Sequence, residues 1–148
     1  MEILVGAAQN NFHMPSTIKG MITGAHILFY SKDPIADRVF FRDVLGFRAV
    51  DAGEGWLIFA LPPAEAALHP AEKNNSKRHA GHDLLSAVLY LMCDDLPAVI
   101  HSLQAKNVSC SPVTEEPWGR KTTFRVPSGG EIGLYQPTHP TAINGKTS

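Results

Sequence analysis

The sequence is poor in cysteine and has no long apolar run. The two cysteines among its 148 residues, Cys93 and Cys110, do not suggest a disulfide framework, so we expect buried, reduced thiols in strands. No apolar stretch reaches the roughly 18 residues that a membrane-spanning helix needs. Residues 1–8 lack the basic start and the cleavage site of a signal peptide. These absences predict a cytoplasmic protein that does not enter a membrane.

The sequence also lacks an excess of either charge. Lysine and arginine number 13 and aspartate and glutamate number 14, which gives a formal net charge of -1. Proteins that bind nucleic acid or anionic membranes carry a basic excess, so we expect neither partner. The chain has no P-loop and no dinucleotide-binding fingerprint. No strand–turn–helix nucleophile motif is present either, so serine- or cysteine-based catalysis has no support.

Residues 22–47 contain the clearest structural signal of the chain. Residues 24–31 are almost all apolar and predict a buried strand. Asp33 can accept hydrogen bonds from the free N–H groups of a first helical turn, and Pro34 suits the first helical position. Gly46 can end the helix in the left-handed conformation. The stretch therefore predicts a strand followed by a helix.

A later stretch repeats this order. Residues 89–93 are apolar, Asp95 can cap a helix, and Pro97 lies near its first turn. Apolar side chains then recur at the spacing of one helix face, at Leu96, Val99, Ile100 and Leu103. The two stretches lie roughly 60 residues apart, a distance that fits two tandem modules rather than a short solenoid repeat.

Further strands complete each predicted module. We expect module one over residues 22–70, with strands at 47–51, 56–61 and 64–69 after its helix. Module two spans residues 86–138, with strands at 86–93, 108–113, 121–126 and 131–136 and a helix at 95–106. Residues 71–85 are charged and polar without periodicity and predict a mobile linker. Residues 1–21 form an N-terminal extension and residues 139–148 a C-terminal tail.

Two sequence motifs resemble those of a known superfamily. Asp33 and the run Phe40-Phe41-Arg42-Asp43-Val44-Leu45-Gly46-Phe47 resemble a signature of the vicinal oxygen chelate superfamily, which comprises glyoxalase I, the bleomycin-resistance proteins and the extradiol dioxygenases. Trp118-Gly119-Arg120, followed by residues 127–137, resembles the ending of the same family. The resemblance covers residues 22–138 and implies an α+β fold. Two tandem βαβββ modules would form curved sheets around a cleft.

The resemblance also implies positions for a metal site. In metal-dependent members, the first and last strands of each module supply one ligand each to the cleft. His26 occupies the first position, but the other three hold Ala67, Val88 (or Ala87) and Gly133, which cannot bind metal. We therefore expect no four-ligand site and no cofactor. The alternative is a displaced site for Zn²⁺, Ni²⁺, Fe²⁺ or Mn²⁺ that uses His26 and Glu131 with His69 or Glu65.

Without a metal, the predicted cleft suits a small organic molecule. Strand alternation and loop position direct a set of side chains toward it. The candidate ligand-binding residues are His26, Tyr30, Trp56, Tyr90, Met92, Trp118 and Phe124. For the aromatic members, the alternative is a place in the core. We expect a protein that binds a small organic ligand; the alternative is a metal-dependent lyase or extradiol-type dioxygenase. The family often pairs protomers, so the resemblance also implies a homodimer.

Overall fold

The computed structural model describes residues 19–71 and 76–143. The chain divides into two units, Met1–Tyr30 and Ser31–Ser148. Parts of the predicted N-terminal extension, of the linker and of the C-terminal tail lie outside the described residues. Within the described ranges, no helix has both the length and the apolar character needed to cross a membrane.

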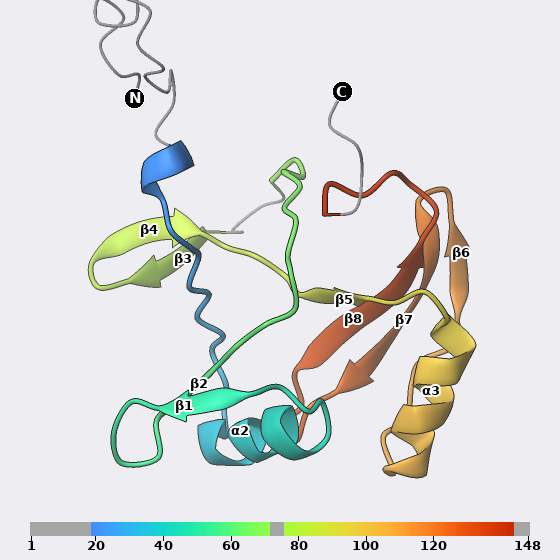
Figure 1. Cartoon of the computed structure of the whole chain (residues 1–148), viewed down its shortest axis with the longest axis horizontal. Helices are drawn as coiled ribbons and strands as arrows, with labels where there is room; N and C mark the ends of the chain where they lie inside the picture. The colour runs from blue at the N-terminus through green and yellow to red at the C-terminus, as the bar shows by residue number, and fades with distance from the viewer. Residues whose placement is uncertain (1–18, 72–75, 144–148) are drawn as a thin grey trace, which may run out of the picture. The chain divides into compact units, whose positions relative to one another are not determined.

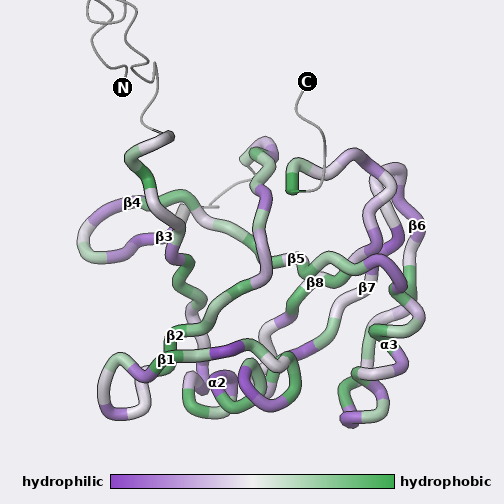
Figure 2. Tube along the Cα trace, viewed as in Figure 1, coloured by the Kyte–Doolittle hydropathy of each residue, from purple (hydrophilic) through white to green (hydrophobic). Residues whose placement is uncertain are grey.

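The described part of the first unit contains a short helix and an irregular segment. The 3-10 helix η1 covers Lys19–Met21. Residues 22–30, largely hydrophobic, follow without regular secondary structure (Figure 2). The prediction of a buried strand at 24–31 is wrong, because Ile27 is 43% exposed and Leu28 is 49% exposed. A strand needs a partner for its backbone, and none of the described strands pairs with this segment.

The second unit contains a four-stranded sheet (Figure 1). Its strands are β5 (Tyr90–Met92), β6 (Thr114–Glu116), β7 (Gly119–Arg125) and β8 (Glu131–Pro137). They lie in the order β5-β8-β7-β6, with β5 parallel to β8 and the other pairs antiparallel. Helix α3 (Leu96–Ala105) connects β5 to β6. This is the βαβββ order predicted for the second half of the chain. The strand expected at 108–113 is found instead just after that range, at Thr114–Glu116.

Of the elements predicted for the first module, the structure contains helix α2 and one hairpin. α2 spans Pro34–Asp43, and the Asp33 carboxylate accepts a hydrogen bond from the Ala36 N–H at 3.2 Å. β1 (Ala49–Asp51) pairs antiparallel with β2 (Leu57–Phe59). The strand predicted at 64–69 is wrong, since these residues have no regular structure. Helix signals are local, whereas a strand depends on a partner elsewhere in the chain.

The predicted linker contains a hairpin that the sequence analysis missed. β3 (Ser76–His79) pairs antiparallel with β4 (His82–Leu85). Ala80 and Gly81 have φ values of 51° and 84°, as in the two-residue turns whose twist matches that of the flanking strands. Arg78 forms an ion pair across the hairpin with Asp83, at 3.1 Å. The stretch lacks alternating hydrophobicity, so periodicity did not reveal it.

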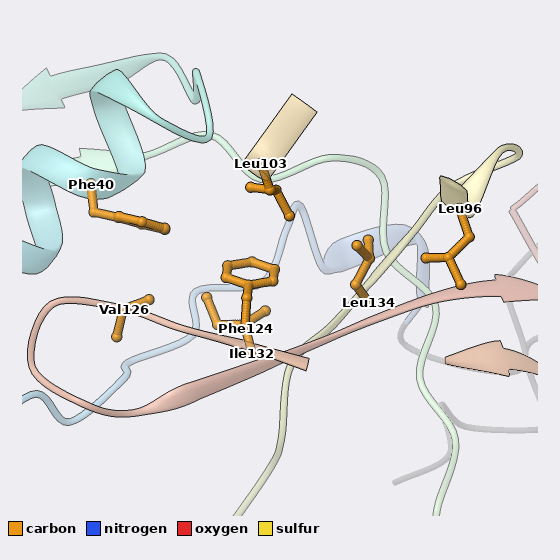
Figure 3. Close-up of a cluster of buried hydrophobic side chains, with 7 residues drawn as sticks. All are labelled: Phe40, Leu96, Leu103, Phe124, Val126, Ile132 and Leu134. Carbon is orange, nitrogen blue, oxygen red and sulfur yellow. The ribbon is translucent and has the colours of Figure 1, made fainter. Parts of the chain in front are cut away.

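The core lies between the helices and one face of the four-stranded sheet (Figure 3). Its buried side chains are Phe40, Leu96, Leu103, Phe124, Val126, Ile132 and Leu134. The rings of Phe40 and Phe124 stack with centroids 6.1 Å apart, which joins α2 to β7. Successive residues of a strand point to opposite faces, so the intervening side chains of β7 and β8 lie on the other face. The protein thus has a mixed α+β fold in which α2 and α3 pack against one face of the sheet.

Candidate functional site

Strand register brings several candidate residues together on the sheet face opposite the core. Tyr90 lies opposite Gly133, and Met92 lies opposite Tyr135. On the other side of β8, Lys121 lies opposite Tyr135. Directly paired residues share a face of a sheet, so these positions form one surface. Tyr90 and Met92, both predicted ligand-binding residues, therefore lie close to each other.

Three aromatic rings on this surface, Tyr90, Trp118 and Tyr135, contact one another and are called the aromatic cluster below. The centroid of Trp118 is 6.0 Å from that of Tyr90 and 5.1 Å from that of Tyr135. The centroids of Tyr90 and Tyr135 are 5.6 Å apart. All three pairs meet edge to face, with interplanar angles of 83°, 80° and 88°. The aromatic quadrupole favours this geometry, so the rings hold one another in place.

The Tyr90 ring lies over Gly133. A Cβ atom at residue 133 would overlap ring carbons of Tyr90. The missing side chain therefore provides the space that the ring occupies. Residue 133 is also the fourth of the metal-ligand positions that the family resemblance implies. In this chain that position is covered by an aromatic ring from the neighbouring strand.

The Tyr135 hydroxyl joins the aromatic cluster to the C-terminal segment. Tyr135 is 8% exposed, and its hydroxyl lies 3.4 Å from the Met92 Sδ. The same hydroxyl lies 3.1 Å from the Nε2 of His139. The Nδ1 of His139 lies 2.8 Å from the Pro140 carbonyl oxygen, which can only accept a hydrogen bond. In the neutral ring Nδ1 therefore carries the proton, and Nε2 accepts from the Tyr135 hydroxyl.

Glu65 contacts the C-terminal segment that follows Tyr135. Its Oε1 accepts a hydrogen bond from the Ala142 N–H at 2.6 Å, which joins the segment after β2 to the C-terminal segment. Burial raises the pKa of Tyr135, and the nearby charge of Glu65 and the Tyr90 hydroxyl raise that pKa further. The phenol therefore stays protonated and can donate a hydrogen bond. The sequence analysis named Glu65 only as an alternative metal ligand and placed His139 in the tail, because no local signal marks either residue.

A lysine borders the aromatic cluster on β7. The Lys121 Nζ lies 5.6 Å from the centroid of the Trp118 ring and 3.4 Å from the Glu116 carboxylate. The ammonium group is thus attracted both by the face of the indole and by a carboxylate. The sequence analysis did not name Lys121, because alternation within β7 becomes informative only once the strand register is known.

The remaining predicted ligand-binding residues belong to other elements of the chain. Phe124 is 2% exposed and packs in the core, in agreement with the alternative given above, and it also lines the groove described in the next paragraph. Trp56 is exposed beside α2, where the Arg38 guanidinium carbon lies 4.7 Å from the ring centroid. His26 and Tyr30 are exposed residues of the first unit. A ligand-binding role for these last three residues stays a prediction.

A shallow groove is present at a different place in the second unit. Its volume is about 490 Å³, and it is lined by Phe40, residues 107–111, residues 123–127 and Glu131. The three residues of the aromatic cluster do not line it. The groove is therefore a separate feature, which an experiment on ligand binding has to distinguish from the cluster.

The residues present do not fit a four-ligand metal site. Three of the four implied positions hold side chains without a donor atom: Ala67, Val88 and Gly133. No three His, Cys, Asp or Glu side chains among the described residues converge as metal ligands would. Glu131 instead accepts a hydrogen bond from the Thr123 hydroxyl at 2.9 Å. The Nδ1 of the exposed His69 lies 2.9 Å from the carbonyl oxygen of Pro70.

Both cysteines are free thiols, but neither lies in a strand as expected: Cys93 follows β5, and Cys110 forms only an isolated bridge with Phe124. Cys93 and Cys110 are half-buried. Burial raises the pKa of each thiol. The thiolate is the reactive form of cysteine, so neither side chain is set up as a nucleophile.

Comparisons with known proteins support the same fold. A sequence profile described as the Glyoxalase/Bleomycin resistance protein/Dioxygenase superfamily matches residues 24–134. No sequence among the curated proteins matches the chain.

Several solved structures are similar to this one. A lactoylglutathione lyase from Agrobacterium tumefaciens is 16% identical, with 77% of this chain and 92% of that chain covered and a TM-score of 0.53. An integron cassette protein from the mobile metagenome of Halifax Harbour Sewage Outfall is 14% identical, with 78% and 99% covered and a TM-score of 0.52. The antibiotic binding protein TnmS3 from Streptomyces sp. CB03234 is 24% identical, with 79% and 99% covered and a TM-score of 0.49. Because the profile matches well over half of its residues, the chain belongs to the Glyoxalase/Bleomycin resistance protein/Dioxygenase superfamily.

Proposed function

We propose that this protein binds a small organic molecule at the aromatic cluster, with an aromatic or apolar part of the ligand against Tyr90 and Trp118. The observation that carries the proposal is the position of Tyr90, which is 38% exposed although two further rings contact it. Trp118 beside it is half-buried, so the two rings together offer apolar surface of the kind that binding sites use. Small-molecule sites combine such a surface with a few polar groups, a role that Lys121 and the Tyr135 hydroxyl fill here.

The rings of the aromatic cluster are already held in position without a ligand, and this favours binding. The three rings already hold one another edge to face, and the space over Gly133 positions Tyr90. A ligand therefore loses little of its binding free energy to ordering these side chains. An aromatic contact contributes roughly 0.5–1.5 kcal/mol beyond the area that it buries, so loss of the Tyr90 ring weakens binding about twofold to tenfold.

Fluorine NMR of fluorotryptophan-labelled protein tests the proposal, because the chain has 2 tryptophans. The variant Trp56→Phe assigns the two resonances. Naphthylmethanol, a neutral aromatic probe, is expected to shift the Trp118 resonance in a saturable manner and to leave the Trp56 resonance unchanged. In Tyr90→Ala the dissociation constant is expected to rise about twofold to tenfold.

A matched control uses an exposed apolar residue away from the aromatic cluster. Val50 is exposed on β1, so Val50→Ala removes apolar surface without touching the cluster and should leave the dissociation constant unchanged. Probe binding without a shift of the Trp118 resonance would place the ligand elsewhere, for example in the groove beside Phe40, and would overturn the proposal.

The metal-dependent alternative has its own test. A displaced site in a lyase or dioxygenase would require His26 and Glu131 as ligands, and His26→Ala would remove the metal. We expect elemental analysis of the purified protein to find no stoichiometric zinc, nickel, iron or manganese. Stoichiometric metal that His26→Ala abolishes would favour the enzyme over the metal-free binding protein.

We also propose a homodimer in the cytoplasm. The two free thiols support this location, because the cytosol keeps thiols reduced. Immunoblots of separated cell fractions check it, and recovery from an oxidising compartment would contradict it.

A further inference from the structure

The segment that follows β8 is contacted both by the aromatic cluster, through Tyr135, and by Glu65. The Tyr135 hydroxyl is 3.1 Å from the His139 Nε2, and the ring centroid of Tyr90 lies 5.6 Å from that of Tyr135. Glu65 comes from the segment after β2 and accepts the Ala142 N–H at 2.6 Å. Figure 1 shows that segment beside the C-terminal segment, so residues far apart in the sequence supply one small area. Neither Glu65 nor His139 lies on the sheet itself.

The charge in this area is negative. Among the described residues Glu65 forms no ion pair, and its side chain is half-buried. Lys121, the cation beside the aromatic cluster, is paired with Glu116 at 3.4 Å. In its neutral form, His139 accepts a hydrogen bond from the Tyr135 hydroxyl at Nε2. That form of the ring adds no charge. The faces of aromatic rings carry negative partial charge, so the aromatic cluster adds to the effect of Glu65.

We infer that the ligand carries a basic nitrogen, which binds at Glu65 and the Tyr135 hydroxyl while its aromatic part lies against Tyr90. This inference rests on the proposed function, because it assigns the charge of the ligand at the same site. An ammonium group gains from the carboxylate and from the ring faces, whereas a carboxylate in the same place is repelled by both. The half-buried position of Glu65 makes this difference larger than it would be for a fully exposed pair.

Three probes that share one ring system test the charge of the ligand. Naphthylmethylammonium, naphthylmethanol and naphthoate differ in charge and have similar apolar surface. We expect the ammonium probe to bind roughly tenfold more tightly than the alcohol, and the carboxylate probe to bind more weakly than both. Isothermal titration calorimetry on the full chain measures the three dissociation constants.

Glu65→Gln is the informative variant, because its amide oxygen can still accept the Ala142 N–H. It should remove the preference for the ammonium probe and leave the affinity for the alcohol unchanged, at an unchanged melting temperature. Glu131→Gln is the matched control, since Glu131 lies on the same sheet and is hydrogen-bonded to Thr123 at 2.9 Å. It should keep the preference.

The outcomes separate this inference from the proposed function. Equal affinity for all three probes, or preference for the carboxylate, would overturn the inference and leave ligand binding at the aromatic cluster intact. The inference also fails if Glu65→Gln keeps the full ammonium preference. Binding of none of the probes would overturn both the inference and the proposed function.

Discussion

Gly133 lies in the middle of β8 and has no positive φ, so its backbone conformation is open to any residue. What it provides is space, because a Cβ atom would overlap the Tyr90 ring. Gly133→Ala is therefore expected to lower the free energy of unfolding by about 1–3 kcal/mol, as overpacking of a filled position does. Urea denaturation followed by circular dichroism measures the change.

The matched control for this prediction is Gly130→Ala. A Cβ atom there has its nearest neighbour at 3.7 Å, an ordinary contact, so stability should change little. In Tyr90→Ala the space above residue 133 is open, and the added Gly133→Ala should then cost much less than in the parent protein. Equal costs in both backgrounds would contradict the clash with Tyr90.

At the scale of elements, one carboxylate of α2 joins the helix to the turn between β7 and β8. Asp37 accepts hydrogen bonds from the Ser128 N–H at 3.0 Å and from the Ser128 hydroxyl at 2.6 Å. The Ser31 hydroxyl donates a further bond to it at 2.6 Å. Asp37→Ala leaves these donors unpaired and is expected to cost about 1–3 kcal/mol of stability, measured by urea denaturation.

Asp43→Ala is the matched control on the same helix. It removes a negative charge from α2 but leaves the contact between Asp37 and Ser128 in place. Asp43 is exposed and pairs with its neighbour Arg42, at 2.7 Å. An exposed ion pair contributes little to stability, so this variant should unfold close to the parent protein. Equal destabilisation by the two variants would show that the contact with Ser128 does not anchor α2.

At the scale of the whole molecule, the apolar side chains of the first unit predict self-association. Exposed members of this segment are Met21, Ile22, Ile27, Leu28, Phe29 and Tyr30. Contiguous exposed apolar surface marks protein interfaces, so we expect a homodimer with this segment in its contact. Sedimentation equilibrium should give about twice the monomer mass of 16.1 kDa.

A charged substitution tests whether the segment forms the contact. Leu28→Asp should dissociate the dimer, whereas Leu85→Asp, at an exposed leucine of β4, should leave the mass unchanged. A monomer at all protein concentrations would contradict the dimer. Dissociation by both variants alike would contradict the role given to residues 22–30.

The sequence by itself determined the two helices and the succession of elements in the second half of the chain. Asp33 and Asp95 cap α2 and α3 as predicted, because a cap depends on residues within one turn of itself. The motifs around Gly46 and Trp118 pointed to the superfamily that the profile match then showed. These features are local, so the linear order of residues is enough to reveal them.

Only the tertiary structure decided which residues meet. A strand requires a partner, and the apolar residues 24–31 have none among the described strands. The contact of Tyr90 with Gly133 follows from the register of β5 and β8, which are joined through α3 and two further strands. Glu65 is joined to the C-terminal segment through the N–H of Ala142, which follows it by 77 residues. Such contacts leave no periodic pattern, because their partners lie far apart in the chain.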